Sequence, residues 1–336
     1  MKLIYSLVAF SVACTTLSGA PGEDGDFEDS GAPSSDGSDG ADGTDGADGA
    51  DGTDGSDGTD GSDGTDGTDG TDGSDGTTEP SPVDYSAAGP SGVASATFSE
   101  NVGSCTVEGT RVSPSSASVG RIILAHGFSR GSTNMVGWAE HLASWGFDVY
   151  VPDLCHSSIF DTNHTLNATE MVSLNAAIGG GPILYMGYSA GGLSAVVAGS
   201  DDRDAVGVVG LDLVDNGDSA LNAARSLAVP FWGVLGESNF CNSNNNGLDV
   251  LAAGSGQAMR IVNADHCDFE SDTDWLCELG CPDLGGSRAA QQDAIAGLIT
   301  SAAVAAFGDA FAAETWWQSG GRHYEDLIST GVAQPE

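Results

Sequence analysis

Positive charge is almost absent from the sequence. Of its 336 residues only nine are Lys or Arg, against 49 Asp or Glu, and the formal net charge is −40. Lys2 is the single lysine. A surface this acidic repels nucleic acid and anionic lipid, because both are polyanions that proteins bind through Lys and Arg. The composition therefore excludes nucleic acid as a partner.

A long hydrophobic run is missing from the N-terminus. Lys2 is followed by one apolar stretch, Leu3 to Val12, and then by small residues. This stretch is far shorter than the ~20 residues that a bilayer span needs. Residues 1–20 are therefore predicted to be a secretory signal peptide, and we expect the protein to be exported.

Two processing sites fit this segment. Ser11-Val12-Ala13-Cys14 resembles a lipobox, where bacterial lipoproteins are cleaved and acylated on the cysteine. Ordinary cleavage after Ser18-Gly19-Ala20 is the alternative. We favour the lipobox, partly because a long polar segment follows. The expected products are a cell-envelope lipoprotein held at the membrane by a lipid on Cys14, or a secreted protein.

Residues 21–80 lack the side chains of a folded core. From Asp36 to Thr77 the triplet Asp-Gly-(Ser/Thr/Ala) repeats fourteen times, with no apolar side chain larger than alanine. Glycine at every third position is typical of collagen, but no proline lies between Pro33 and Pro80, and a triple helix depends on proline. Because each triplet carries one negative charge, we expect a disordered, extended acidic linker, with weak calcium binding left open.

Residues 81–336 are long enough for one folded domain. They contain an even set of six cysteines, which in an exported protein predicts disulfides, although six cysteines allow about fifteen pairings. Cys277 and Cys281 have the spacing of half a zinc site, but no second cysteine pair with histidines lies near them. We therefore expect no metal and no cofactor. The six cysteines are Cys105, Cys155, Cys241, Cys267, Cys277 and Cys281.

Strand and helix patterns alternate along this domain. Alternating or buried apolar runs predict a strand pair in 104–114 and strands at 120–125, 147–151, 183–186, 205–213, 229–235 and 258–263. Helical spacing predicts helices at 134–145, 167–178, 192–198, 219–227, 248–253 and 287–313. This alternation predicts an α/β fold with a mostly parallel central sheet and helices on both faces. Ligands of such sheets bind beyond the carboxyl ends of the strands.

The clearest motif is Gly187-Tyr188-Ser189-Ala190-Gly191, a G-x-S-x-G turn between a buried strand and a helix of small residues. This context is that of a nucleophile elbow, in which the serine hydroxyl is exposed on a tight turn. Ser189 is the predicted nucleophile.

A serine hydroxyl needs a histidine to take its proton and a carboxylate to orient that histidine. In this architecture the chain order is Ser, acid, His, which leaves two histidines after Ser189. His266 follows the last predicted strand, whereas His323 lies in a polar tail and is expected to be a solvated surface residue. We predict His266 as the base.

The acid has three candidates. Asp212 comes directly after the apolar run 205–211, and Asp215 follows three residues later in a place that suits a helix cap. Glu237 follows the next strand, where Asn239 stands at the usual position of the acid. We place Asp212 first, then Asp215, then Glu237.

The reaction also needs two backbone N–H donors for the oxyanion. One is the amide of Ala190, directly after the nucleophile. The other is expected in the turn His126-Gly127-Phe128, from the Phe128 amide. His126 is then a structural residue of that turn.

Four segments carry a family resemblance: HGF (126–128), GYSAGG (187–192), GLDLVD (210–215) and ADHCDF (264–269). Together they resemble the chlorophyllase and poly(ethylene terephthalate)-hydrolase, or cutinase-like, branches of the α/β-hydrolase superfamily over roughly residues 100–300. In chlorophyllases the acid lies in a G-[IL]-D-P-V segment, which 210–214 matches except for Leu213. The resemblance thus implies Asp212 as the acid and an α/β-hydrolase fold.

The resemblance also implies the chemistry. We expect an exported, monomeric serine hydrolase that cleaves a small-molecule or polymeric carboxylic ester through an acyl-enzyme. An amidase or peptidase with the same triad, and an inactive hydrolase-fold protein that serves as a surface interaction module, are the alternatives.

Polyester hydrolases have one cysteine after the penultimate strand and another just past the histidine, as Cys241 and Cys267 are here. Since these loops should be neighbours at the crevice, we favour a Cys241–Cys267 bridge. Cys277–Cys281 and Cys105–Cys155 would then be the other two.

Overall fold

The computed structural model describes residues 82–103, 105–281 and 283–336. The predicted signal peptide, the lipidation candidate Cys14 and the predicted linker 21–80 lie outside the described residues. Within the described part, the chain forms a mixed α/β domain. No helix in this part is long and apolar enough to cross a bilayer.

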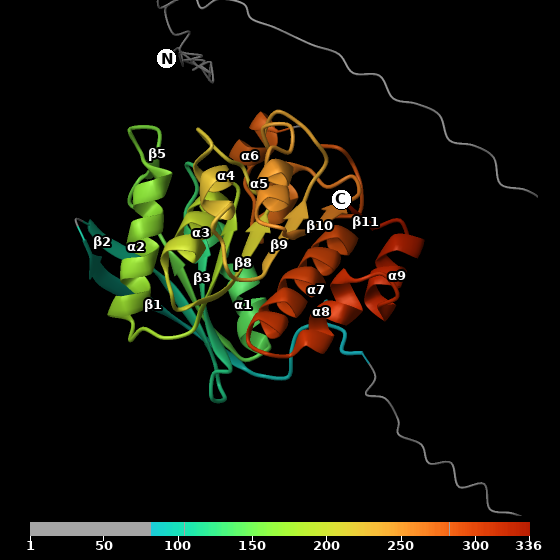
Figure 1. The fold of residues 1–336 in the computed structure, drawn as a ribbon, viewed down its shortest axis with the longest axis horizontal. Helices are drawn as coiled ribbons and strands as arrows, with labels where there is room; N and C mark the ends of the chain where they lie inside the picture. Colours follow the sequence, from blue (N-terminus) through green and yellow to red (C-terminus); the bar gives the residue numbers. More distant parts are fainter. Residues whose placement is uncertain (1–81, 104, 282) are drawn as a thin grey trace, which may run out of the picture. The chain divides into compact units, whose positions relative to one another are not determined.

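A nine-stranded sheet runs through the described residues in the order β1-β2-β4-β3-β7-β8-β9-β10-β11 (Figure 1). Its six central strands, β4 to β10 in that order, are parallel, as expected. Antiparallel strands flank them: β1 and β2 at one edge and β11 at the other. The strand bounds are β1 Val93–Val102, β2 Cys105–Pro114, β3 Gly120–Ala125, β4 Phe147–Pro152, β7 Ile183–Tyr188, β8 Ala205–Leu211, β9 Phe231–Leu235, β10 Gln257–Ile261 and β11 Ala333–Pro335. A separate hairpin pairs β5 (Ser157–Ser158) with β6 (Asp161–Thr162).

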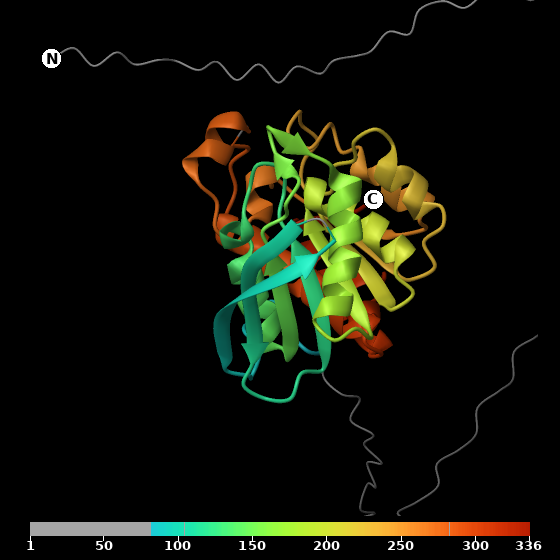
Figure 2. The same ribbon diagram turned by 90° about the vertical axis from the view of Figure 1, so that its left-hand side faces the viewer.

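Helices cover both faces of the sheet (Figures 1 and 2). One face packs against α2 (His164–Ala177), α3 (Ala190–Asp201), α4 (Ser219–Ala224) and α5 (Gly247–Ala253). The other packs against α1 (Val136–Ser144), α7 (Arg288–Ala306) and α8 (Ala310–Trp317), with α9 (Arg322–Ser329) beside α8. The described residues also form two 3₁₀ turns, η1 (Ser132–Asn134) and η2 (His266–Phe269), and one short helix, α6 (Trp275–Gly280).

Strand β3 illustrates why both faces are apolar. Ile122 and Leu124 pack in the core that contains α1, α7 and α8, while Ile123 and Ala125 pack in the core that contains α2 to α5. Successive side chains of a strand point to opposite faces, so a strand buried on both sides reads as a continuous apolar run.

Several elements differ from the sequence-based expectation, including the unpredicted β5–β6 hairpin and helices α6 and α9. The predicted strand pair within 104–114 is a single strand, β2, whose partner β1 lies upstream. β1 escaped prediction because most of its residues are exposed, and its alternating positions Ala94, Ala96 and Phe98 give only a weak apolar pattern. The predicted helix 287–313 is two helices, because the chain turns at Gly308 with φ of 116°. β11 adds a strand beyond 258–263, which was expected to be the last.

Candidate active site

The G-x-S-x-G turn joins β7 to α3 in a tight, strained geometry. Ser189 has φ 54° and ψ −126°, values that L-residues rarely adopt. The two glycines make this turn possible. A Cβ on Gly187 would lie 2.2 Å from the Gly191 carbonyl oxygen, and one on Gly191 would lie 2.3 Å from the His126 carbonyl oxygen. The predicted elbow context, a strand, a strained serine and a helix, is therefore present.

The structure brings three predicted side chains into one hydrogen-bonded row. His266 Nε2 lies 2.9 Å from Ser189 Oγ, and His266 Nδ1 lies 2.6 Å from Asp212 Oδ2. The three residues come from the ends of different strands: β7, β8 and the turn η2 after β10. All three are buried, and Asp212 is completely inaccessible. In this row the Nδ1–H group donates a hydrogen bond to the Asp212 carboxylate, which leaves Nε2 free to accept a proton from the serine.

The other two acid candidates do not face His266. Asp215 accepts hydrogen bonds from the backbone amides of Ala220 (2.8 Å) and Leu221 (3.1 Å), so it caps the start of α4. Glu237 accepts two hydrogen bonds of 2.7 Å from Nη1 of Arg260. Of the three carboxylates, only Asp212 contacts the imidazole.

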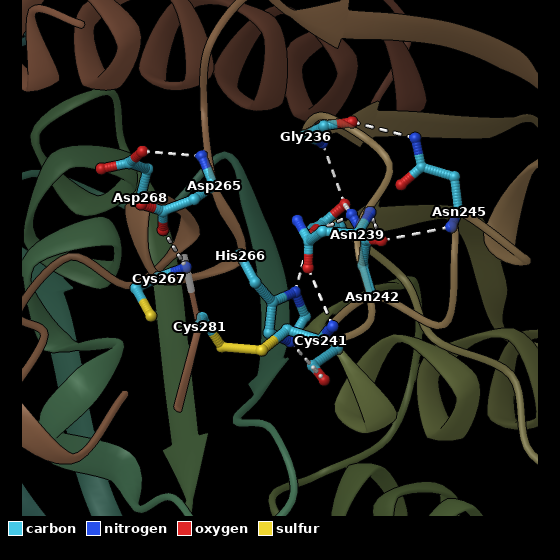
Figure 3. A network of polar contacts seen from close by, with 12 residues as sticks. Gly236, Asn239, Cys241, Asn242, Asn245, Asp265, His266, Cys267, Asp268 and Cys281 are labelled. Carbon is cyan, nitrogen blue, oxygen red and sulfur yellow. Dashed lines mark hydrogen bonds and ion pairs between the residues drawn. A yellow bond between two sulfur atoms is a disulfide. The ribbon is translucent and has the colours of Figure 1, made fainter. Parts of the chain in front are cut away.

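Asn242 is a site residue that the sequence did not reveal. Its fully buried Nδ2 donates to Asp212 Oδ1 (3.3 Å) and Oδ2 (3.2 Å), and the Gly236 amide donates to Oδ1 at 2.9 Å (Figure 3). Asn239, the residue at the usual acid position, instead donates to the Glu237 carbonyl and shapes the loop. The sequence shows that this loop is rich in asparagine, but no spacing rule predicts which asparagine contacts the Asp212 carboxylate.

The predicted oxyanion donors are free. Within the described residues, neither the Phe128 amide nor the Ala190 amide donates to a protein acceptor. Gly127 brings the turn close to the elbow, since a Cβ there would lie 3.1 Å from the Ser189 Cβ. Two N–H groups without a protein acceptor, close to the Ser189 hydroxyl, are what an oxyanion requires.

His126 anchors that turn, as expected. Its Nε2 accepts from the Leu154 amide at 3.0 Å, so Nδ1 carries the proton and donates to the Gly127 carbonyl at 2.8 Å. Burial lowers the pKa of His126 below its usual value, which keeps the ring neutral. His323, expected to be solvated, is half-buried on α9 and stacks on Trp316 at 4.4 Å.

The predicted Cys105–Cys155 bridge is confirmed. The predicted Cys241–Cys267 and Cys277–Cys281 bridges are wrong, since Cys241 pairs with Cys281 and Cys267 pairs with Cys277. The two bridges are neighbours, since the Sγ atoms of Cys267, Cys277 and Cys281 lie within 4.8 Å of one another. Helix α6 supplies both partners: Cys277 in its first turn pairs with Cys267, and Cys281 directly after its last residue pairs with Cys241.

The described residues offer two groups with metal-binding spacing. Both are built on bridged cysteines: Cys267, Cys277 and Cys281 in one, and Cys105, Cys155 and Glu170 in the other. A zinc ligand must be a thiolate, and a bridged cysteine has none. With the bridges intact, neither group offers a metal a complete set of ligands.

Comparison with known proteins bears on the N-terminal part of the chain. Residues 17–81 match the collagen triple helix repeat family (20 copies). The match covers the Asp-Gly triplets and ends where the α/β domain begins. No curated protein matches the chain.

Proposed function

We propose that this chain is a serine hydrolase that cleaves carboxylic esters, built on an α/β-hydrolase fold. The observation that carries the proposal is the Ser189–His266–Asp212 row, with contacts of 2.9 and 2.6 Å at the carboxyl edge of a mostly parallel sheet. The chain order Ser, Asp, His and the position of the serine between strand and helix are those of α/β-hydrolases.

The proposed reaction has two half-reactions, acylation and deacylation of Ser189, and in each of them His266 acts first as base and then as acid. Ser189 Oγ attacks the ester carbonyl carbon while His266 Nε2 takes its proton, and Asp212 stabilises the imidazolium that forms. The amides of Phe128 and Ala190 bind the oxyanion. His266 then gives the proton to the leaving alcohol, which leaves an acyl-serine. In the second half-reaction a water molecule attacks the acyl-serine while His266 takes its proton. His266 then returns this proton to Ser189 Oγ, and the carboxylic acid is released.

Ser189→Ala tests the proposal. The variant should lose hydrolysis of p-nitrophenyl esters by about 10⁴-fold or more, and it should lose labelling by a fluorophosphonate probe, since only an activated serine reacts. Its circular dichroism and melting temperature should stay close to those of the parent. More than a tenth of the parental activity in this variant would reject Ser189 as the nucleophile.

A substrate panel separates ester cleavage from the alternatives. p-Nitrophenyl esters of increasing acyl length are compared with matched p-nitroanilides. Turnover of the esters alone supports an esterase, and comparable turnover of the anilides indicates an amidase. A parent protein that neither turns over nor labels would indicate an inactive interaction module.

We also propose that the protein works outside the cytoplasm. Three disulfides in one domain support this location, because the cytosol keeps thiols reduced. Fractionation of cells that express the full chain tests it. Mass spectrometry of the N-terminus distinguishes lipid on Cys14 from cleavage after Ala20.

A further inference from the structure

One buried ion pair joins the two halves of the candidate site. Arg130 lies two residues after Phe128, in the turn that offers an oxyanion donor, and Glu270 lies four residues after His266. Their contact is bidentate: Nε donates to Oε1, and Nη2 donates to Oε2 at 2.7 Å. The Arg130 side chain is 10% exposed and that of Glu270 is inaccessible.

The same arginine reaches a third element. Its Nη1 donates at 3.2 Å to Asp274, the residue whose carboxylate caps α6. One guanidinium thus contacts the segment after the proposed base and the helix that carries Cys277. A planar guanidinium holds two carboxylates in a fixed geometry, which an ammonium group does not.

Other contacts already join these segments. Trp138 Nε1 donates to the Phe269 carbonyl, and the amides of Ser271 and Asp272 donate to the Asn134 carbonyl. These bonds start from η1 and α1, whereas Arg130 lies in the oxyanion turn itself. The attachment of the two segments therefore does not depend on the ion pair alone.

Stability is a weak reason for such a pair. The cost of desolvating two charges often equals or exceeds their attraction, so a buried pair contributes little compared with apolar residues of the same size. What it supplies is a defined geometry. Here that geometry relates the turn of one proposed oxyanion donor to the loop of the proposed base.

We propose that Arg130 and Glu270 form a positioning pair, which sets the Phe128 amide relative to His266 in the transition state. This inference rests on the proposed hydrolase function. Neither residue is catalytic, since each acts through the loop that it holds. A misplacement of about 1 Å between such groups costs about 10²-fold in rate.

The test compares four variants of the full chain on p-nitrophenyl butyrate. Arg130→Met and Glu270→Gln each break the pair, and Arg130→Lys keeps the charge but loses the bidentate geometry. The double variant Arg130→Met, Glu270→Met removes the pair without leaving a buried charge, so it guards against loss of fold.

Arg111→Met is the control, at an arginine–carboxylate pair that is more exposed than the Arg130 pair. Arg111 makes the same bidentate contact with Asp148, at 2.8 Å for both bonds, near the amino end of β4 and so at the opposite edge of the sheet. Both pairs link two segments, but only the Arg130 pair links segments of the site.

We expect kcat to fall by about 10²-fold in Arg130→Met and in the double variant, with KM within about threefold of the parent. The kcat of Arg130→Lys should lie between that of Arg130→Met and that of the parent. Arg111→Met should keep the parental kcat even where its melting temperature drops.

A double variant that folds and keeps a kcat within threefold of the parent would overturn the positioning role. A fall in kcat of the same size in Arg111→Met would also overturn it, because it would show that loss of stability alone lowers kcat. In either outcome the parent protein is still active, so the hydrolase proposal is unaffected. A parent without probe labelling or turnover would reject the hydrolase, and the positioning role with it.

Discussion

Ser189 and Asp212 both occupy backbone conformations that side chains disfavour, with φ of 54° and 41°. Such residues cost about 1–3 kcal/mol each, and they persist where surrounding contacts determine them. Here the Ser189 amide donates to the Leu211 carbonyl at 2.9 Å, and the Asp212 amide donates to the Val234 carbonyl at 2.7 Å. The strands on either side thus hold two triad candidates in place.

Asp212→Asn should lower ester hydrolysis by about 10⁴-fold, because an amide cannot stabilise the imidazolium by charge. Asp215→Asn should cost about 1 kcal/mol of stability as a weakened cap, with little change in kcat. Glu237→Gln removes a charge that faces Arg260 and should leave kcat close to the parent. Steady-state kinetics on one ester ranks the three. Greatest damage in Glu237→Gln would place the acid on the later strand.

His126 predicts a pH dependence of stability. Its folded pKa is lowered by burial, so below its ordinary pKa of about 6.5 the unfolded chain takes up a proton that the native state refuses. The free energy of unfolding therefore falls as pH drops below that value. Gln offers a donor and an acceptor in place of the ring nitrogens and does not titrate.

Urea unfolding at neutral pH and at about pH 5 measures this effect. The loss of stability between the two should be smaller in His126→Gln than in the parent. Since the other histidines are unchanged in the variant, the difference isolates His126. Identical losses in both proteins would contradict the assignment.

Among single residues, sequence reasoning located Ser189, Asp212 and His266, which the structure brings into contact. It had local signals for them: a motif, a strand end and a fixed chain order. It did not locate Asn242 or the Arg130–Glu270 pair. These contacts depend on how loops of irregular shape meet, and no spacing along the chain encodes that.

At the scale of elements, the parallel strands and the helices between them were predictable because burial on both faces leaves continuous apolar runs. The exposed strand β1 lacks that signal. The position of α6 was also not predictable, since it follows from loop contacts such as Arg130 with Asp274. The bridge pattern depends on α6, and the predicted Cys241–Cys267 pairing failed for that reason.

Two double variants separate the roles of the bridges. Cys241→Ser with Cys281→Ser opens a loop of 40 residues, and Cys105→Ser with Cys155→Ser opens one of 50. In the chain-entropy model each should cost about 4 kcal/mol of stability. Only the first should also lower kcat, because Cys241 adjoins Asn242, which holds Asp212.

Unfolding in urea and kinetics on p-nitrophenyl butyrate provide both readouts. Peptide mapping of the unreduced parent should first recover Cys241 joined to Cys281. Equal kcat in the two double variants, both measured on folded protein, would show that the Cys241 bridge has no influence on the acid.

For the whole molecule, the acidic charge is shared between the two parts of the chain. Residues 1–79 hold 20 of the 49 acidic side chains, and residues 80–336 hold the other 29 together with all eight arginines. All the residues placed in the candidate site belong to the second part. The collagen-like match, residues 17–81, begins in the first part and ends at its boundary with the second.

A chain that lacks residues 21–80 should therefore keep its specific activity on a soluble ester. The expected kcat/KM lies within about twofold of the full chain, because no site residue is removed. Kinetics at several calcium concentrations checks whether the repeats supply an ion. A loss of more than a few-fold would show that the repeats contribute to the site.

The two bridges around α6 are nested. The Cys267–Cys277 bridge lies inside the 40-residue loop that Cys241 and Cys281 close, and residues such as Asp272 and Asp274 between them are exposed. A protease that cuts one peptide bond there converts the chain into two polypeptides without separating them. The two polypeptides stay joined by both disulfides until a reductant breaks them. The fragment that contains His266 therefore stays linked to the fragment after the cut.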